Sequence, residues 1–99
     1  MTIYGYARVS TAHQENNLQI DALTRAGAQS IIQEKASGVR SRKELAALLA
    51  KLRPGDCVLV YKLDRFARSL LDLLGIIAKI EAARATFRSL TESIDTATP

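Results

Sequence analysis

The stretch Cys57-Val58-Leu59-Val60-Tyr61 is apolar along its whole length, with no charged or small polar residue at alternate positions. A strand of this composition has both faces covered, which is typical of the inner strands of a parallel sheet. The turn sequence Pro54-Gly55-Asp56 comes directly before it and marks where the strand begins. The stretch therefore predicts an inner strand of an α/β domain.

Strand and helix patterns alternate on both sides of this stretch. The predicted strands cover residues 3–9, 30–33, 57–61 and 87–90. The predicted helices run from near Thr11 to Gly27, from Arg42 to Leu52 and from Ser69 to about Ala83. This alternation predicts the α/β class, here a three-layer α/β/α domain with a mostly parallel sheet of four to five strands. The polar segment from Thr91 to Pro99 is interpreted as a tail or linker.

The helix that begins at Ser69 carries more apolar residues than one buried stripe needs. Ser69 and Asp72 have the spacing of a helix N-cap and its partner. The apolar residues that follow are Leu70, Leu71, Leu73, Leu74, Ile76, Ile77 and Ile80. A helix that is apolar nearly all round is buried or partnered. Two interpretations stay open: a deep core helix under the sheet, or a helix whose outer face is covered by another segment or subunit.

The composition limits the classes of protein that the chain can belong to. Its 99 residues are enough for one domain, and 47% hydrophobic with 24% charged residues is ordinary for a soluble globular protein. The net charge of +4 favours polyanionic partners only weakly. Without a run of roughly 18 apolar residues, the chain has no candidate membrane span. We therefore expect a cytoplasmic protein.

Cysteine and histidine each occur once, as Cys57 and His13. A disulfide within the chain is therefore impossible, and a zinc site would lack ligands. Because Cys57 lies in the apolar 57–61 strand, we expect it to be a buried core thiol in a reducing compartment. We expect no metal or other cofactor.

Polar residues follow three of the predicted strands. Ser10 comes just after the 3–9 strand, which also carries Arg8, and Arg42 comes after the 30–33 strand. Arg65 and Arg68 come after the 57–61 strand. Since the carboxyl ends of parallel strands meet at one edge of a sheet, we expect these side chains to gather there. A hydroxyl among guanidiniums is suited to binding a phosphate and to attacking it.

Each of these residues also has an ordinary structural explanation. Ser10, at a strand-to-helix junction, has the position of a cap or turn residue. Asp64 and Arg68 have the i,i+4 spacing of a surface ion pair. Arg42 could be a solvated residue in the first turn of its helix, although a cation there opposes the helix dipole. These alternatives stay open for each residue taken alone, but the gathering of all of them at three strand ends favours a phosphate site.

Phosphodiester chemistry explains why these residue types would gather. Attack on phosphorus adds charge to the non-bridging oxygens, which planar guanidiniums bind in a bidentate manner. In the absence of a metal cluster in the sequence, arginines would supply this stabilisation. The sequence contains no glycine-rich phosphate loop and no dinucleotide fingerprint, which removes the commonest nucleotide-binding classes.

With these residues in view, the chain resembles the serine recombinase family, the resolvases and DNA invertases. The segment Tyr6-Ala7-Arg8-Val9-Ser10-Thr11 is similar to the nucleophile segment of the family. The second block of the family is similar to Lys35-Ala36-Ser37-Gly38 together with Arg42. The third block of the family is similar to Lys62-Leu63-Asp64-Arg65-Phe66-Ala67-Arg68-Ser69. The segment from Phe87 to Thr96 is most similar to the invertase branch. The blocks occur in order and at the right spacing from Ile3 to the last residue.

The resemblance implies site-specific DNA recombination without metal or ATP. Ser10 would attack a DNA phosphodiester and leave a 5′-phosphoserine link and a free 3′-hydroxyl. The residues implied to bind the scissile phosphate are Arg8, Arg42, Arg65 and Arg68. Arg68 would be the candidate acid for the leaving oxygen, and Asp64 would orient arginines. Three further residues match supporting positions of the family, namely Gln14, Gln19 and Lys51.

The resemblance also implies partners and a location. Double-stranded DNA would be the substrate, and homodimers would assemble into a synaptic tetramer that exchanges strands by subunit rotation. An accessory DNA-bending protein would be a further partner, and no membrane is involved. The location would be the bacterial cytoplasm, in association with the nucleoid.

The sequence departs from the family pattern at two positions. Arg84 stands where many family members have a glycine that ends the preceding helix, and a left-handed cap there would cost on the order of 1 kcal/mol. The spacer between Gly38 and Arg42 is one residue shorter than in some members. A shorter loop could set Arg42 back from the phosphate.

Family members continue into a long oligomerisation helix and a helix-turn-helix DNA-binding domain, whereas this sequence stops at Pro99. We therefore expect residues 1–99 to be a catalytic domain cut before those parts, which binds DNA weakly and is inactive in recombination by itself. Two rival functions remain: a non-catalytic DNA-binding or regulatory module of the same fold, and a phosphatase with a seryl intermediate.

Overall fold

The computed structural model describes residues 1–9, 13–35, 42–63, 66–67, 69–92 and 94–95, with the backbone alone for 13–15 and 94–95. The elements follow one another in the order β1 (Ile3–Val9), α1 (His13–Arg25), β2 (Ser30–Lys35), α2 (Lys43–Lys51), β3 (Cys57–Val60), α3 (Leu70–Ala82), β4 (Thr86–Ser89) and β5 (Ile94–Asp95). The strands form one sheet in the order β2-β1-β3-β4-β5, in which the first four are parallel and β5 pairs antiparallel with β4.

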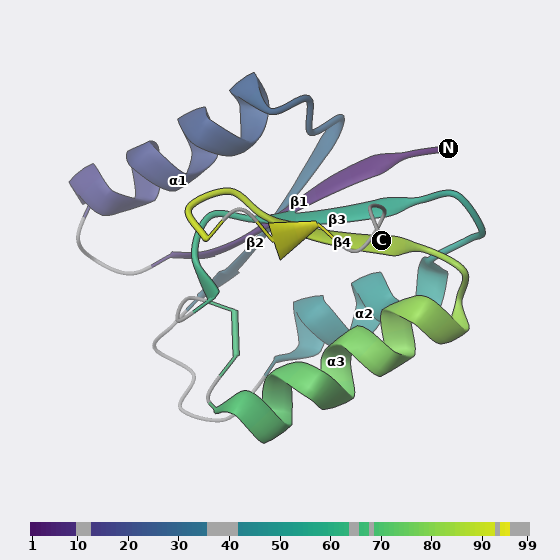
Figure 1. The fold of residues 1–99 in the computed structure, drawn as a ribbon. Helices are drawn as coiled ribbons and strands as arrows, with labels where there is room; N and C mark the ends of the chain where they lie inside the picture. Colours follow the sequence, from purple (N-terminus) through teal and green to yellow (C-terminus); the bar gives the residue numbers. More distant parts are fainter. Residues whose placement is uncertain (10–12, 36–41, 64–65, 68, 93, 96–99) are drawn as a thin grey trace.

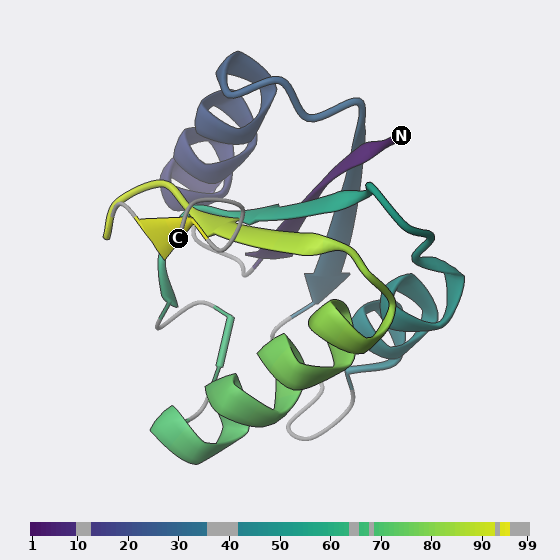
Figure 2. The same cartoon turned by 45° about the vertical axis from the view of Figure 1, so that its right-hand side comes forward.

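The helices make two layers, one on each face of this sheet. α1 covers one face, and α2 and α3 lie side by side on the other (Figures 1 and 2). This arrangement confirms the predicted α/β/α class with a mostly parallel sheet. The presence of β5 shows that the interpretation of residues 91–99 as a tail was wrong for Ile94 and Asp95, since a strand of two residues is too short to produce an alternating pattern.

The sheet separates two apolar clusters because side chains alternate between its faces. Tyr6, Val58 and Val60 pack with α2 and α3, whereas Ala7 and Leu59 pack with α1. In β3 the residues from 58 to 60 are at most 1% exposed. An inner strand covered on both faces, as predicted from its continuous apolar composition, is therefore confirmed.

Pairing within the sheet moves some boundaries away from the prediction. β2 continues two residues beyond Gln33 because Glu34 and Lys35 pair with Arg8 and Val9 of β1. Cys57 begins β3 at the margin of the α1-side cluster and is half-buried rather than buried as expected.

α3 is not the deep core helix that one interpretation predicted. Ile76 and Ile80 are buried, but Leu70, Leu71 and Leu74 are 71%, 81% and 55% exposed. One face of the helix packs on the sheet, and its amino-terminal leucines lie on the surface. Among the described residues, none of the helices combines the length and the hydrophobicity that a membrane-spanning helix needs.

The carboxyl end of α3 is closed by a residue in the left-handed conformation. Arg84 has φ of 61°, as expected from the resemblance, which implied a glycine-like position at the end of this helix. We expect Arg84→Gly to raise the free energy of unfolding by about 1 kcal/mol, because a side chain is strained in this conformation and glycine is not. Urea denaturation would measure the change. Arg53→Gly serves as a control outside the left-handed region, and an Arg84→Gly protein no more stable than the wild type would contradict the expectation.

Candidate functional site

The three arginine-containing blocks follow three neighbouring strands. β1 lies between β2 and β3, and all three run in the same direction. Ser10 is the next residue after β1, the block that leads to Arg42 follows β2, and the 62–69 block follows β3. The three strands therefore end at the same edge of the sheet, where all three blocks follow them, and the strand that leads to Ser10 is the middle one.

The structure describes only some of the residues expected to form the site. Arg8, Arg42, Gln19 and Lys51 are described with their side chains, and Gln14 by its backbone in α1. The remaining predicted site residues lie outside the described residues, namely Ser10, Asp64, Arg65 and Arg68.

Gln19 of α1 is buried against the end of β1 that carries Arg8. It is 1% exposed, and its Nε2 donates a hydrogen bond of 2.9 Å to the backbone oxygen of Arg8. Within the described part of the chain, Gln19 Oε1 and Arg8 Nε are buried without a hydrogen-bond partner. Gln19 thus holds the backbone of β1 two residues before Ser10, and its supporting role in the reaction stays a prediction.

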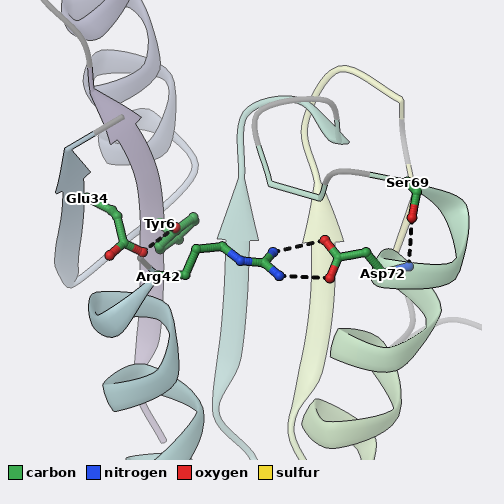
Figure 3. Close-up of polar contacts among 5 residues, drawn as sticks. All are labelled: Tyr6, Glu34, Arg42, Ser69 and Asp72. Carbon is green, nitrogen blue, oxygen red and sulfur yellow. Dashed lines mark hydrogen bonds and ion pairs between the residues drawn. The ribbon is translucent and has the colours of Figure 1, made fainter. Parts of the chain in front are cut away.

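Arg42 and Asp72 form a bidentate ion pair that joins the amino ends of α2 and α3. Arg42 Nη1 and Nη2 donate to the two carboxylate oxygens at 2.9 and 2.8 Å, and the side chains are 21% and 22% exposed (Figure 3). The hydrogen bond to Asp72 raises the pKa of Arg42 above its already high value. The backbone N–H of Asp72 is in turn capped by Ser69 Oγ at 3.1 Å, so the predicted N-cap is confirmed.

Tyr6 and Glu34 form a buried pair beside this ion pair, and neither residue was predicted from the sequence as part of the site. Tyr6 Oη donates to Glu34 Oε1 at 2.6 Å (Figure 3). Burial and then the hydrogen bond and charge of Glu34 raise the pKa of Tyr6, whereas the positive charges of Arg8 and Arg42 lower it. Both guanidiniums therefore lie within electrostatic reach of one hydroxyl. The signal in the sequence that could have identified Tyr6 was the alternation of side chains along the strand, which puts Tyr6 and Arg8 on the same face of β1.

Glu92 holds the start of the third block against the end of β4. It accepts hydrogen bonds from the Leu63 backbone N–H and from the Ser89 and Thr91 hydroxyls. These hydrogen bonds lower the pKa of the Glu92 carboxyl, and the bond from Ser89 has the largest effect. Thr91 also donates its backbone N–H to the Tyr61 oxygen at 3.1 Å. Its hydroxyl oxygen lies 2.9 Å from the same carbonyl and shares its one proton between Tyr61 and Glu92. The chain that leads to Asp64 and Arg65 is therefore anchored by a segment that sequence analysis interpreted as a tail.

Lys51 lies at the other end of α2 from Arg42. Its Nζ is 5.1 Å from the centre of the Tyr4 ring, which is near the start of β1. Nine residues of helix separate the two ends of α2 by about 13 Å. The structure therefore brings Arg8, Gln19 and Arg42 to one edge of the sheet and places Lys51 away from it. In the described part of the chain, no group of three or more His, Cys, Asp or Glu residues could hold a metal ion.

Comparison with known proteins gives a match over nearly the whole chain. The family model described as "Resolvase, N terminal domain" matches residues 3–99. A probable DNA-invertase from Sinorhizobium fredii is 49% identical over 98 residues, which cover 98% of this chain and 32% of that protein. A serine recombinase from Escherichia phage Mu is 43% identical over 98 residues, which cover 98% of this chain and 51% of that protein. The chain thus spans about a third of the length of the first relative and about half of the length of the second.

Among solved structures, a resolvase family site-specific recombinase from Streptococcus pneumoniae has the same fold. The TM-score is 0.75 at 19% sequence identity, and the match covers 100% of this chain and 78% of that one. At this identity the likeness concerns the fold alone.

Proposed function

Since the chain belongs to the resolvase family, as its sequence blocks predicted, we propose that residues 1–99 are the catalytic domain of a serine-class site-specific DNA recombinase. The observation that carries the proposal is the strand order β2-β1-β3. In this order the three strands that precede the blocks end at one edge of the sheet, and the strand that leads to Ser10 lies between the other two. A purely structural role for these blocks would not require them to follow three adjacent strands.

In the proposed reaction Ser10 Oγ forms a bond to the phosphorus of a DNA phosphodiester. The bond from phosphorus to the 3′ oxygen breaks, Ser10 loses its proton to a base, and the leaving oxygen gains one, with Arg68 as the candidate donor. The phosphate stays on Ser10 as a 5′-phosphoserine, which conserves the bond energy for religation by the reverse steps. No metal, ATP or other cofactor takes part.

Arginines supply the electrostatic stabilisation in this scheme. Arg8 is the best supported of them, because its buried Nε lacks an acceptor among the described residues and a phosphate oxygen would provide one. Arg42 lies within electrostatic reach of the same hydroxyl as Arg8 and is bonded to Asp72. Arg65 and Arg68 complete the proposed phosphate ligands, and Asp64 orients them.

The partners follow from the same proposal. The substrate is double-stranded DNA, the longer protein acts as a homodimer that forms a synaptic tetramer, and an accessory DNA-bending protein assists. The protein works in the bacterial cytoplasm on nucleoid DNA. Its reaction is inversion or resolution, the two kinds of recombination named for relatives such as the Sinorhizobium DNA-invertase and the Enterococcus faecalis transposon resolvase.

The test is covalent attachment of the protein to cleaved DNA. The protein expressed from the complete gene is incubated with supercoiled DNA that carries the flanks of the gene, and the reaction is stopped with detergent. We expect protein joined to 5′ ends, with the attachment mapping to Ser10 and absent in Ser10→Ala. Ser30→Ala, at the opposite end of the sheet, is the matched control and retains the attachment.

The proposal fails if Ser10→Ala still becomes attached, or if neither protein becomes attached on any DNA that the wild type binds tightly. Tight binding without attachment would favour the non-catalytic module, whereas turnover of small phosphate esters alone would favour a phosphatase. Sequence-specific cleavage by residues 1–99 without the rest of the protein would contradict the assignment of these residues as a domain that needs further parts to recombine DNA.

A further inference from the structure

Helix α2 begins at a residue that cannot cap it. Arg42 occupies the N-cap position and makes no side-chain capping hydrogen bond within the described residues. The residues favoured there accept a hydrogen bond from the backbone N–H groups two and three positions on, and a guanidinium has no acceptor. A cation at this position also opposes the helix dipole. The first turn of α2 therefore needs an acceptor from elsewhere in the chain.

Glu34 of β2 supplies that acceptor. Its Oε2 accepts from the backbone N–H of Glu44 at 3.0 Å, and its Oε1 accepts from that of Leu45 at 3.2 Å. These are the two donors that an N-cap side chain would satisfy. The carboxylate is 4% exposed, and its charge is favourable at the amino end of a helix. Glu34 thus acts as the N-cap of a helix that starts nine residues after it in the chain.

The third donor to Glu34 ties the same carboxylate to β1. Tyr6 Oη donates to Oε1 at 2.6 Å, and Tyr6 lies two residues before Arg8 on the same face of the strand. One buried carboxylate therefore joins the strand that carries Arg8 to the helix that begins at Arg42. The Arg42 side chain extends away from its own helix to Asp72, while Glu34 caps that helix (Figure 3).

We propose that Glu34 is a positioning residue for Arg42. Glu34 holds the backbone from which Arg42 projects, and Asp72 holds its guanidinium, so that the two carboxylates set where the cation lies relative to β1. The role in DNA cleavage rests on the proposed function, whereas the positioning itself can be measured without DNA.

The first measurement is the rate at which phenylglyoxal modifies Arg42, followed by peptide mass mapping of the folded protein. Charge-assisted hydrogen bonds protect the guanidinium, so Asp72→Asn, the positive control, is expected to speed modification about tenfold. Glu34→Ala is expected to speed it by a similar factor, because the first turn of α2 loses its cap. Glu34→Gln keeps the volume and one acceptor oxygen, and an intermediate rate is expected.

Two control variants separate positioning from a general loss of stability. Leu49→Ala weakens the packed face of the same helix without touching its first turn, and Tyr6→Phe removes the third donor without touching the α2 backbone. Both are expected to leave the modification rate of Arg42 at the wild-type value. If Leu49→Ala speeds modification as much as Glu34→Gln does, or if Glu34→Gln and Glu34→Ala leave the rate unchanged, the positioning role is overturned.

The second measurement is single-turnover attachment to DNA by the protein from the complete gene. Misplacement of a binding group by about 1 Å can cost on the order of 100-fold, so Glu34→Gln is expected to slow attachment by roughly 10- to 100-fold. In an Arg42→Ala background the same substitution is expected to have no further effect, since it acts through Arg42. Equal losses in both backgrounds would overturn the role. If the wild type forms no attachment, the proposed function fails, while the modification rates still decide whether Glu34 positions Arg42.

Discussion

Replacement of Phe66 by alanine is expected to lower the free energy of unfolding by about 3–5 kcal/mol, the range for deleting a buried aromatic side chain. Phe66 is 0% exposed and lies between Tyr6 and Phe87. Its ring centre is 5.7 Å from that of Tyr6 at an interplanar angle of 75°, and 5.0 Å from that of Phe87 at 23°. Alanine would remove both aromatic contacts and leave a cavity at the centre of the larger cluster.

The loss would be a large share of the 5–15 kcal/mol that typically stabilises a domain. Phe66 also stands between Arg65 and Arg68 in sequence, so that its ring attaches the third block to the core. We therefore expect Phe66→Ala to reduce DNA attachment in the complete protein even at temperatures where the domain stays folded.

Urea denaturation of the 99-residue chain would measure the change in stability. Leu71→Ala is the matched control, because Leu71 is 81% exposed and its truncation should change stability by no more than about 0.5 kcal/mol. A loss below about 1 kcal/mol for Phe66→Ala would show that the ring is not held in the core as the structure has it.

The same substitution, glycine to alanine, is expected to have opposite effects at Gly5 and Gly75. A Cβ at Gly5 would lie 3.2 Å from Ala28 Cβ and 3.2 Å from two carbons of Leu23, where β1 meets α1 and the segment after it. Such overpacking costs about 1–3 kcal/mol. A Cβ at Gly75, inside α3, would meet no described atom within 4 Å. Alanine there is expected to stabilise the protein by about 0.5–1 kcal/mol, because glycine in a helix loses more conformational freedom on folding.

Thermal and urea unfolding of the two variants side by side would measure this difference. The identical chemical change makes each variant the control of the other, since only the surroundings of the added methyl group differ. Equal effects of the same sign would contradict the close packing of β1 on α1.

Local patterns were sufficient for most of the fold. The apolar run at 57–61 identified the inner strand, because a strand with both faces covered has apolar side chains on both faces. Ser69 identified the start of α3, since an N-cap depends on residues within one helical turn. The left-handed end at Arg84 was expected from the family resemblance and not from a local pattern. Boundaries were missed where pairing between strands decided them, as at Glu34 and Lys35 in β2.

The sequence by itself determined the fold class, the strands and helices other than β5, and the three blocks that follow neighbouring strands. Only the tertiary structure decided how the described site residues are held: Tyr6 meets Glu34 across 28 residues, Arg42 meets Asp72 across 30, and Glu92 meets Leu63 across 29. Helix and strand periodicities relate residues a few positions apart, so they carry no signal for such pairs. A buried carboxylate must find donors wherever the packed elements bring them, and that requirement is met only once the sheet and its two helix layers have assembled.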